Sequence, residues 1–156
     1  MKKQIKIVVA TEDDSHDIWS WRNDPDTIKN SNSPDPVAWD NHAKWYNRML
    51  MSNETEILIG KVDGDQEKIG MVRFDKDEKR HHLVCSINLN PKWRGKGLAA
   101  DLLKEAIAHR RIGKSWPIYA EVKPSNQASI RCFEKNAFQY NDNSEGINRY
   151  LRPPAK

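Results

Sequence analysis

The sequence predicts an α+β fold in which one mixed sheet carries helices on both faces. Three observations support this class. Strand-like segments occur both before and between helix-like segments, so the order of elements is mixed. Residues 81–89 alternate apolar and polar side chains with a period of two, and residues 97–111 carry an apolar stripe at helical spacing. The 156 residues match about one domain, so we expect a single domain over residues 1–156.

The N-terminal part is expected to form a strand at residues 6–10, followed directly by a helix. Thr11 is the expected N-cap, because acidic residues follow it in the first turn, where they meet the positive end of the helix. The N-D-P-D stretch at residues 23–26 ends that helix, since the residue before a proline avoids the helical region. A loop at residues 31–36 and a second helix at residues 37–51 are expected next.

The rest of the chain is expected to form a meander and then alternating helices and strands. Asp63-Gly64-Asp65 is a hairpin signal between the first two strands of the meander. Gly113 is a good terminator for the preceding helix. The expected strands lie at residues 54–62, 67–74, 81–89, 118–123, 137–140 and 147–151, and the expected helices at residues 97–111 and 124–136.

Composition excludes several classes of protein. Apolar residues make up 37% of the chain and six tryptophans are present, which is too apolar and aromatic for a disordered chain. Seven glycines and eight prolines are too few for a fibrous or low-complexity protein. The net charge of +4 is not gathered into the dense basic stripe of a duplex-binding surface, so we expect no nucleic-acid partner.

The compartment is expected to be the cytoplasm. The basic start MKKQIK is followed by only four apolar residues, too few for an export signal, and no run approaches the length of a membrane span. Cys85 and Cys132 are expected to be buried free thiols, because neither has the spacing of a metal site. We therefore expect no metal and no membrane partner.

The segment most suited to chemistry is residues 89–100, a strand end followed by a glycine-containing turn and an amphipathic helix. Gly95 and Gly97 would let a ligand approach the backbone closely. Free amides and the positive end of the helix together attract a phosphate group. Arg94 and Lys96 would add positive charge at the same place.

Two known phosphate-binding motifs and one structural interpretation compete for this turn. It does not match a P-loop, which requires G-x-x-x-x-G-K-[S/T]. It does match the relaxed dinucleotide fingerprint Gly95-x-Gly97-x-x-Ala100, with Glu121 near the place of the ribose-binding acid. The 35 residues after Glu121 leave little room for a second mononucleotide-binding half. The structural interpretation, in which the glycines only shape a strand–helix turn, stays open.

A third motif is more specific. Arg94-x-x-Gly97-x-Ala99 resembles the R/Q-x-x-G-x-G/A pyrophosphate-binding signature of the GNAT superfamily of N-acetyltransferases. The pattern N-x-x-S-x-x-x-F-x-K-x-x-F at residues 126–138 is similar to the N-x-x-A/S-x-x-x-Y-x-K-x-G-F element of the same superfamily. The resemblance implies the GNAT fold, a mixed and mostly antiparallel sheet of about six or seven strands with helices on both faces.

The resemblance also implies that acetyl-coenzyme A is the co-substrate. Backbone amides of the glycine turn would bind the pyrophosphate, and main-chain groups of Ile87 and Leu89 would pair with the pantetheine arm, which Asn126 would help to hold. The residues implied in coenzyme binding are Ile87, Leu89, Arg94, Gly95, Lys96, Gly97, Leu98, Ala99, Asn126, Ser129, Phe133 and Lys135.

The catalytic residues are less clearly marked, because Phe133 stands where many members place the tyrosine that protonates the departing thiolate. Phenylalanine has no proton to give, so Tyr140 and Tyr119 are the candidate donors. The attacking amine must be neutral, and Glu121 at a strand end is the preferred base. The alternative bases are His81 and His82.

The N-terminal half is expected to supply the acceptor site. Its W-R-N-D-P and W-x-x-H-x-x-W sequences look like the branch of the superfamily that acetylates amino groups on nucleotide-linked sugars, as in pseudaminic acid biosynthesis. In that interpretation Arg22 and Asn23 face sugar or phosphate, and Trp39 and His42 belong to an aromatic surface that stacks on the ligand. Helical spacing of these aromatic residues fits a core stripe equally well, and we favour the core for Trp45.

The sequence therefore predicts transfer of an acetyl group from acetyl-coenzyme A to a primary amine by direct attack on the thioester. The expected acceptor is a small molecule, the amino group of a nucleotide-linked amino sugar. A protein N-terminus, an antibiotic or a polyamine are alternative acceptors. A non-catalytic acyl-coenzyme A-binding module is the alternative from a different class, and the sequence leaves a homodimer open.

Overall fold

A computed structural model describes residues 4–62, 64 and 66–154. Within these residues seven strands form one sheet in the order β1-β2-β3-β4-β5-β7-β6. The strands are β1 (Ile5–Val9), β2 (Thr55–Val62), β3 (Lys68–Asp77), β4 (His82–Leu89), β5 (Ile118–Val122), β6 (Gln139–Ser144) and β7 (Ile147–Arg152). The helices are α1 (Ser15–Arg22), α2 (Pro25–Asn30), α3 (Trp39–Met51), α4 (Ala99–His109) and α5 (Gln127–Glu134), with short 3-10 turns η1 (Glu12–Asp14) and η2 (Pro91–Trp93).

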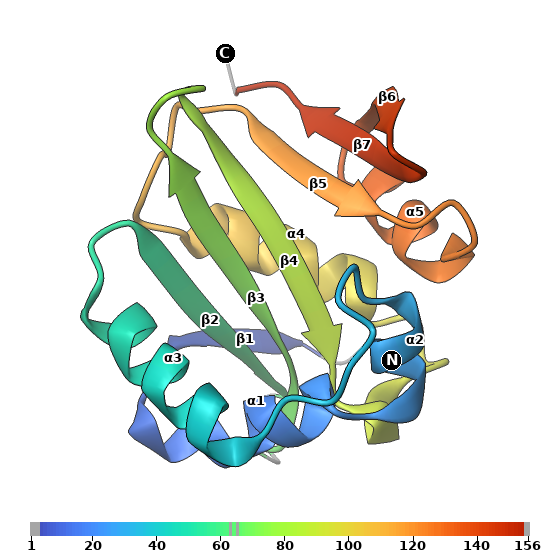
Figure 1. The fold of residues 1–156 in the computed structure, drawn as a ribbon. Coiled ribbons are helices and arrows are strands. Elements are labelled where there is room, and N and C mark those ends of the chain that lie inside the picture. The colour runs from blue at the N-terminus through green and yellow to red at the C-terminus, as the bar shows by residue number, and fades with distance from the viewer. Residues whose placement is uncertain (1–3, 63, 65, 155–156) are drawn as a thin grey trace.

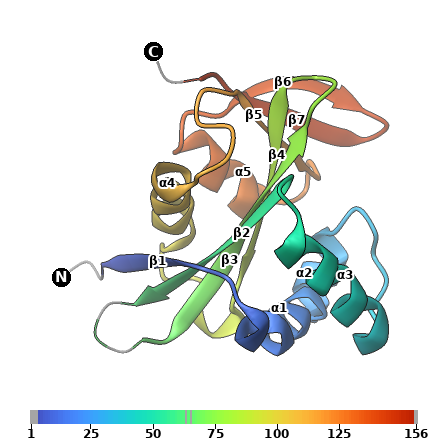
Figure 2. The same ribbon diagram turned by 90° about the vertical axis from the view of Figure 1, so that its left-hand side faces the viewer.

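Helices cover both faces of this sheet, as Figures 1 and 2 show. Helices α4 and α5 lie on what we name the back face, and α1, α2 and α3 lie on the front face. Among the described strands, β4 and β5 are parallel neighbours and all other neighbours are antiparallel. The predicted α+β class and the mixed, mostly antiparallel sheet are confirmed.

The two faces bury separate apolar cores. On the back face Leu102 and Leu103 of α4 are fully buried against strand residues such as Leu83. On the front face Ile18 of α1 and Tyr46 of α3 pack on β2 and β3. Both cysteines are buried free thiols, as expected. Side chains along β4 thus point alternately to the back face, where they pack against α4, and to the front face.

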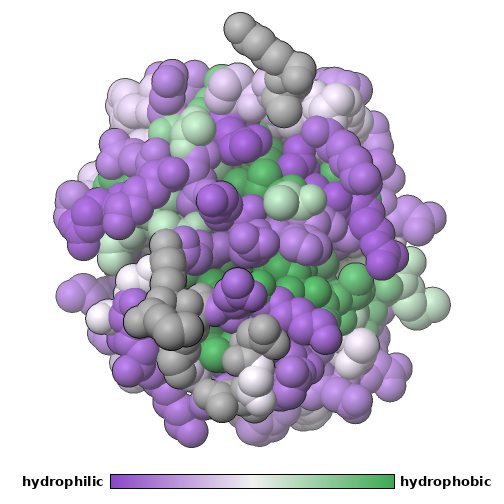
Figure 3. Space-filling view, turned by 180° about the vertical axis from the view of Figure 1, so that it is seen from behind, coloured by the Kyte–Doolittle hydropathy of each residue, from purple (hydrophilic) through white to green (hydrophobic). Residues whose placement is uncertain are grey.

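The surface is mixed. Seen from behind, apolar areas lie between hydrophilic side chains that cover most of the view (Figure 3). The large apolar side chains most exposed among the described residues are Val9, Trp39, Met51 and Tyr140. None of the described helices has the length and apolar character needed to span a bilayer.

Several element boundaries differ from the sequence expectations for local reasons. Helix α4 begins at Ala99 rather than at residue 97, because Gly97 has a φ of +73°. Strand β6 begins at Gln139 rather than at residue 137, because Ala137 has a φ of +67°. Residues 1–3 of the basic start, and Asp63 and Asp65 of the hairpin signal, lie outside the described residues.

Helix α2 was not expected from the sequence. The Asp24 side chain caps it by accepting hydrogen bonds from the backbone amides of Asp26 at 3.1 Å and Thr27 at 3.4 Å. Pro25 occupies the first helical position, where its missing N–H costs nothing. The proline that ends α1 therefore also starts a new helix in a different direction.

Candidate active site

Strands β4 and β5 pair at one end and separate at the other. Their register contains two pairs, Leu83 with Ile118 and Val84 with Tyr119. Strand β4 continues beyond this point, and all of it up to Leu89 stays paired with β3. Figure 1 shows the two ribbons diverging towards their C-terminal ends. We name this opening the β4–β5 wedge, with its apex at Val84 and Tyr119.

The wedge leaves main-chain groups of β4 without a strand partner. The amide of Leu83 donates to the carbonyl oxygen of Pro117 at 2.9 Å, so this residue directs its backbone groups towards β5. Successive strand residues direct these groups to alternate edges. Ile87 and Leu89 therefore direct theirs into the wedge, where an extended ligand with amide groups can pair with them. These are the two residues expected to bind the pantetheine arm.

The turn between β4 and α4 presents a row of free amides. Gly95 and Gly97 have φ values of +72° and +73°, and beyond the glycine itself and its two chain neighbours no heavy atom lies within 4 Å of the position of a Cβ on either. Within the described part of the chain, the amides of Gly95, Lys96, Gly97, Leu98 and Ala99 donate to no acceptor. The first bond of the helix runs from the Leu102 amide to the Leu98 carbonyl oxygen at 2.9 Å. An anion placed here would meet both free donors and the positive end of α4.

The two cations of this turn lie in different surroundings. Lys96 is exposed, with Nζ 5.9 Å from the centre of the Trp93 ring. Arg94 instead contacts α2, where its Nη1 is 2.7 Å from Asp24 Oδ2 and its Nη2 donates to Thr27 Oγ1 at 2.8 Å. The structure thus leaves Lys96 available to an anion and engages Arg94 elsewhere.

Helix α5 carries the second motif predicted to bind coenzyme. The Asn126 side chain caps the helix by accepting from the Ser129 amide at 3.3 Å. Phe133 is 3% exposed and lies edge-on to Phe138 with ring centres 5.0 Å apart, so its ring is part of the core. Lys135 is exposed at the end of the helix.

The end of α5 is joined to the start of α4. Asn136 Nδ2 donates to the Ala100 carbonyl oxygen at 3.0 Å and to the Cys132 carbonyl oxygen at 3.0 Å. Ala100 lies in the first turn of α4, directly after the free amides. The two helices that carry the predicted coenzyme motifs therefore meet at the glycine turn.

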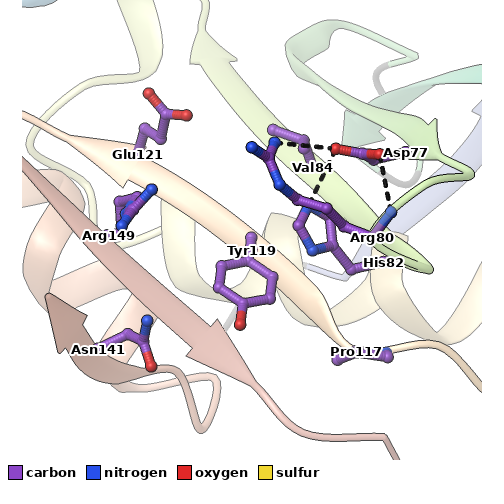
Figure 4. Close-up of a pocket in the computed structure, with 9 residues that line it drawn as sticks. All are labelled: Asp77, Arg80, His82, Val84, Pro117, Tyr119, Glu121, Asn141 and Arg149. Carbon is purple, nitrogen blue, oxygen red and sulfur yellow. Dashed lines mark hydrogen bonds and ion pairs between the residues drawn. The ribbon is translucent and has the colours of Figure 1, made fainter. Parts of the chain in front are cut away.

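Two shallow depressions lie side by side on the front face near the wedge apex. The larger has a volume of about 460 Å³ and includes Tyr119 and His82, and the smaller has a volume of about 230 Å³ and includes Asn32 and Glu145. Glu121 and Arg149 line both, so the two depressions adjoin at these residues. Figure 4 shows the larger one, with side chains contributed by β4, β5 and the β6–β7 hairpin.

Charges of both signs line these depressions. Glu121 of β5 is the register partner of Arg149 of β7, and it is exposed. Arg149 Nε donates to Asp142 Oδ1 at 2.6 Å, and its Nη2 pairs with the other oxygen of the same carboxylate. The Arg149 hydrogen bond and charge lower the pKa of Asp142 against a smaller opposing effect of burial. Glu121 is thus an open carboxylate beside a guanidinium that another carboxylate already binds.

His82 is buried at the other end of the larger depression. Its ring lies 4.2 Å from the Tyr119 ring, and its Nε2 is 3.6 Å from Asp77 Oδ2. Burial lowers the pKa of His82, and the nearby Asp77 charge only partly offsets this. His81 instead contacts Trp116, with the ring centres 4.1 Å apart and the two planes tilted by 41°.

The structure does not bring Tyr140 and Glu121 together. Tyr140 is the register partner of Tyr150, which is the partner of Ala120 and belongs to the back-face core. Directly paired residues share a face and neighbours in a strand alternate, so Tyr140 and Glu121 lie on opposite faces. Tyr119 lies on the same face as Glu121, two positions before it in β5.

The residues predicted to bind the acceptor are engaged with the chain itself. Arg22 Nη2 donates to the Ser33 carbonyl oxygen at 2.8 Å. Asn23 binds both backbone groups of Val37, donating to its oxygen and accepting from its amide, each at 2.8 Å. These contacts hold the loop at residues 31–38. Arg22 Nη1 is buried without a hydrogen-bond partner among the described residues, and a contact of Arg22 and Asn23 with a sugar or phosphate stays a prediction.

The aromatic residues of α3 divide between core and surface. His42 is 3% exposed, donates from Nε2 to the Ser15 carbonyl oxygen at 2.9 Å and stacks on Tyr46, so it has no open side to offer a ligand. Trp39 is 41% exposed and lies edge-on to Trp19. Trp45 is half-buried against the front-face core, as expected.

Sequence reasoning missed Arg149, Asn32 and Glu145. Arg149 and Tyr150 are neighbours in β7 and therefore face opposite sides, but the N-R-Y-L stretch has no clean alternation that would show which side is open. That Arg149 lies opposite Glu121 follows from the register of β5 with β7, which no local pattern indicates. Among the described residues, no three His, Cys, Asp or Glu side chains come together as a metal site.

Comparison with known proteins agrees with this geometry. A family model described as an acetyltransferase (GNAT) domain matches residues 5–139. L-2,4-diaminobutyric acid acetyltransferase of Vibrio cholerae serotype O1 is 31% identical over 87 residues, which cover 55% of this chain and 45% of that protein. The protein of the same name from Halalkalibacterium halodurans is 40% identical over 62 residues, which cover 40% of this chain and 33% of that protein. The chain thus matches less than half the length of these curated relatives.

Solved structures share the fold over nearly the whole chain. The crystal structure of spermidine N-acetyltransferase from Vibrio cholerae in complex with CoA and spermine has a TM-score of 0.77 and 17% identity, covering 95% of this chain and 93% of that one. A domain from Methanocaldococcus jannaschii has a TM-score of 0.74 and 20% identity, covering 96% of this chain and 98% of that one. At these identities the likeness establishes the fold.

Proposed function

Because the chain belongs to the acetyltransferase (GNAT) domain family, we propose that it transfers an acetyl group from acetyl-coenzyme A to the primary amine of a small molecule. The observation that carries this proposal is the position of the open β4 edge next to the free amides of the glycine turn. An extended ligand with amide groups followed by a diphosphate can pair its amides with the open β4 edge and place its diphosphate on the free amides of the turn. We treat residues 1–156 as one catalytic domain.

The residues present fit acetyl-coenzyme A. Its diphosphate would lie on the amides of residues 95–99, with Lys96 as the nearby cation, and its pantetheine amides would pair with Ile87 and Leu89. The unfilled space around Gly95 and Gly97 supports this placement, because any side chain there would cover the amides. When bound, the group supplies an activated acetyl thioester at the apex of the wedge.

Glu121 is the proposed general base. An alkylamine has a pKa of about 10, so near neutral pH it must lose a proton before it can attack. Glu121 is exposed on the front face two positions beyond the apex residue Tyr119, and it can accept that proton directly or through one water molecule. The neutral amine would then attack the thioester carbonyl to form the C–N bond, the C–S bond would break to release a thiolate, and the nitrogen would lose its extra proton to solvent to give the amide.

Tyr119 is the better placed of the two candidate proton donors. It lies at the apex on the same face as Glu121, whereas Tyr140 lies on the other face. A proton from Tyr119 or from water would neutralise the departing thiolate. Phe133 contributes packing to this region and no proton.

We further propose that the acceptor is a small molecule with more than one charged group, such as a diamino acid. Glu121 and Glu145 offer carboxylates to ammonium groups around the smaller depression, and Nη1 of Arg149, which does not take part in the two bonds to Asp142, can bind a ligand carboxylate there. The names of the two curated relatives agree with this class. A nucleotide-linked amino sugar remains the second acceptor to test, suggested by the W-R-N-D-P and W-x-x-H-x-x-W sequences.

A thiol-release assay with a panel of amines tests the function. The panel contains L-2,4-diaminobutyrate, spermidine, a nucleotide-linked amino sugar and a peptide with a free N-terminus, with 2-aminobutyrate as the control that lacks the second amine. We expect the highest kcat/KM for the diamino acid and little turnover of the control. Preference for the nucleotide sugar would overturn the acceptor class, and coenzyme binding without any turnover would favour a non-catalytic acyl-coenzyme A-binding module.

A further inference from the structure

Helix α2 spans the open end of the β4–β5 wedge. One end of the helix is bonded to Arg94, which follows β4, and the other end is bonded to Lys123, which directly follows β5. Figure 1 shows the helix lying between the C-terminal ends of these two strands. A short element from the N-terminal half is thus attached to both arms of the opening.

The contact at the first end is dense. Arg94 Nη1 lies 2.7 Å from Asp24 Oδ2 and 3.5 Å from Asp26 Oδ2, and Nη2 donates to Thr27 Oγ1. The same Asp24 carboxylate caps α2. Burial raises the pKa of Asp24, but the hydrogen bond and charge of Arg94 and the backbone amides of Thr27 and Asp26 together outweigh it, so the pKa of Asp24 lies below its ordinary value. Arg94 therefore stabilises both the position and the cap of the helix.

The contact at the second end uses the last turn of the helix. Lys123 Nζ donates to the Lys29 carbonyl oxygen at 3.0 Å, where a cation also meets the negative end of the helix. Asn32 follows this end by a few residues and lines the smaller depression with Glu121. The position of α2 therefore determines how far Asn32 lies from Glu121.

We propose that Arg94 and Lys123 are positioning residues for the acceptor, because together they hold α2 across the wedge and place Asn32 opposite Glu121. This inference rests on the proposed function, since it assigns residues to the acceptor side of the same reaction. It differs from the role that the sequence motif implies for Arg94, which is a direct contact with the diphosphate. On the present geometry that contact would require Arg94 to leave Asp24 and Thr27.

The test compares acceptor KM with coenzyme affinity in matched variants. The acetyl-coenzyme A Kd is measured by calorimetry, and the acceptor KM is measured with the best amine of the panel. Arg94→Ala and Lys123→Ala should each raise the acceptor KM roughly three- to tenfold and leave the acetyl-coenzyme A Kd unchanged. Lys96→Ala removes the other cation of the same turn. It should raise the acetyl-coenzyme A Kd and leave the acceptor KM unchanged. Arg94→Lys should recover part of the lost affinity, since it keeps a charge beside Asp24.

Thr27→Val is the mild variant, because it removes one hydroxyl contact to Arg94 and keeps the shape of the side chain. It should also raise the acceptor KM, by less than Arg94→Ala, and it keeps the test valid if Arg94→Ala folds poorly. The inference is overturned if Arg94→Ala weakens the acetyl-coenzyme A Kd as much as Lys96→Ala does while the acceptor KM stays unchanged. Absence of turnover by the unmodified chain would overturn the proposed function as well, so the two failures are distinguishable.

Discussion

Val84 and Tyr119 form the last register pair between the parallel strands β4 and β5, and the sheet opens from that pair onward. On one side of the pair lie the unpaired backbone groups of Ile87 and Leu89. The side chains of the pair themselves line the front-face depression that contains Glu121. The pair thus marks the place where a thioester held along β4 and an amine held on the front face can meet.

Gly97→Val should weaken acetyl-coenzyme A binding at least about tenfold, because a side chain there would cover the amides of the turn. Gly64→Val is the matched control, since Gly64 also has a positive φ, of +95°, and open space around it. Both variants should lose about 1–2 kcal/mol of stability from the left-handed backbone. Calorimetric titration separates them, and equal coenzyme affinities in the two variants would contradict the amide cradle.

Glu121→Gln should lower kcat roughly 100-fold at pH 7, because the amide cannot accept the proton of the ammonium group. The loss should shrink as the pH is raised, since the amine then deprotonates without help. Glu134→Gln on α5, an exposed glutamate outside both depressions, is the control and should have normal kcat. A pH–rate profile identical in shape to that of the unmodified chain would count against Glu121 as the base.

Asn23→Ala should lower the free energy of unfolding by about 1–3 kcal/mol, because it leaves the Val37 amide without its partner and removes one of the two donors to the Val37 carbonyl oxygen, the other being Trp19 Nε1. Denaturant unfolding measures this loss, and faster proteolysis at residues 31–38 should accompany it. Asn32→Ala, an exposed change in the same loop, should leave stability nearly unchanged. If Asn23→Ala instead raised only the KM for a nucleotide sugar at unchanged stability, the sequence interpretation of the W-R-N-D-P motif would be right.

Phe133→Tyr should not raise kcat. The ring is 3% exposed and packs against Phe138, so a hydroxyl placed there loses water and costs about 1–2 kcal/mol of stability. Thermal unfolding and steady-state assays measure the two effects. A gain in kcat of about tenfold or more would show that protonation of the thiolate limits turnover and that position 133 can supply the proton.

Stability should fall as the pH drops below 6.5, in part because of His42. Burial lowers its pKa from 6.5, while the hydrogen bond to Ser15 partly opposes this. Below pH 6.5 His42 therefore binds a proton in the unfolded chain before it does so in the folded chain. The stability that neutral His42 contributes is present above pH 6.5 and is lost as the pH falls towards the lower pKa of His42 in the folded chain. His42→Gln should flatten the slope of the unfolding free energy between about pH 6.5 and pH 5, and an unchanged slope would contradict this role of His42.

Much of the fold could be predicted because its signals are local. The period-two pattern of β4, the apolar stripe of α4 and the glycine turn between them each lie within a few residues of one another. The same turn predicted the free amides, since glycines before a helix both permit a positive φ and leave donors unpaired.

The acceptor side could not be predicted because it depends on distant contacts. Arg94 meets Asp24 and Thr27, and Glu121 meets Arg149, only after the sheet has formed its register. Arg22 and Asn23 look like ligand-binding residues in the sequence, but arginine and asparagine bind loop carbonyl groups equally well. The start of α2 did carry a local signal, an aspartate followed by a proline at the first helical position.

Hydrogen exchange at single backbone amides tests the central claim most directly. In the free chain the amides of Ile87, Leu89 and Gly97 should exchange quickly, while Leu83, bonded to Pro117, exchanges slowly. Saturating acetyl-coenzyme A should protect the first three and leave Leu83 unchanged. Saturable binding of acetyl-coenzyme A that protects other amides, with Ile87, Leu89 and Gly97 still exchanging freely, would contradict the placement of the coenzyme in the wedge.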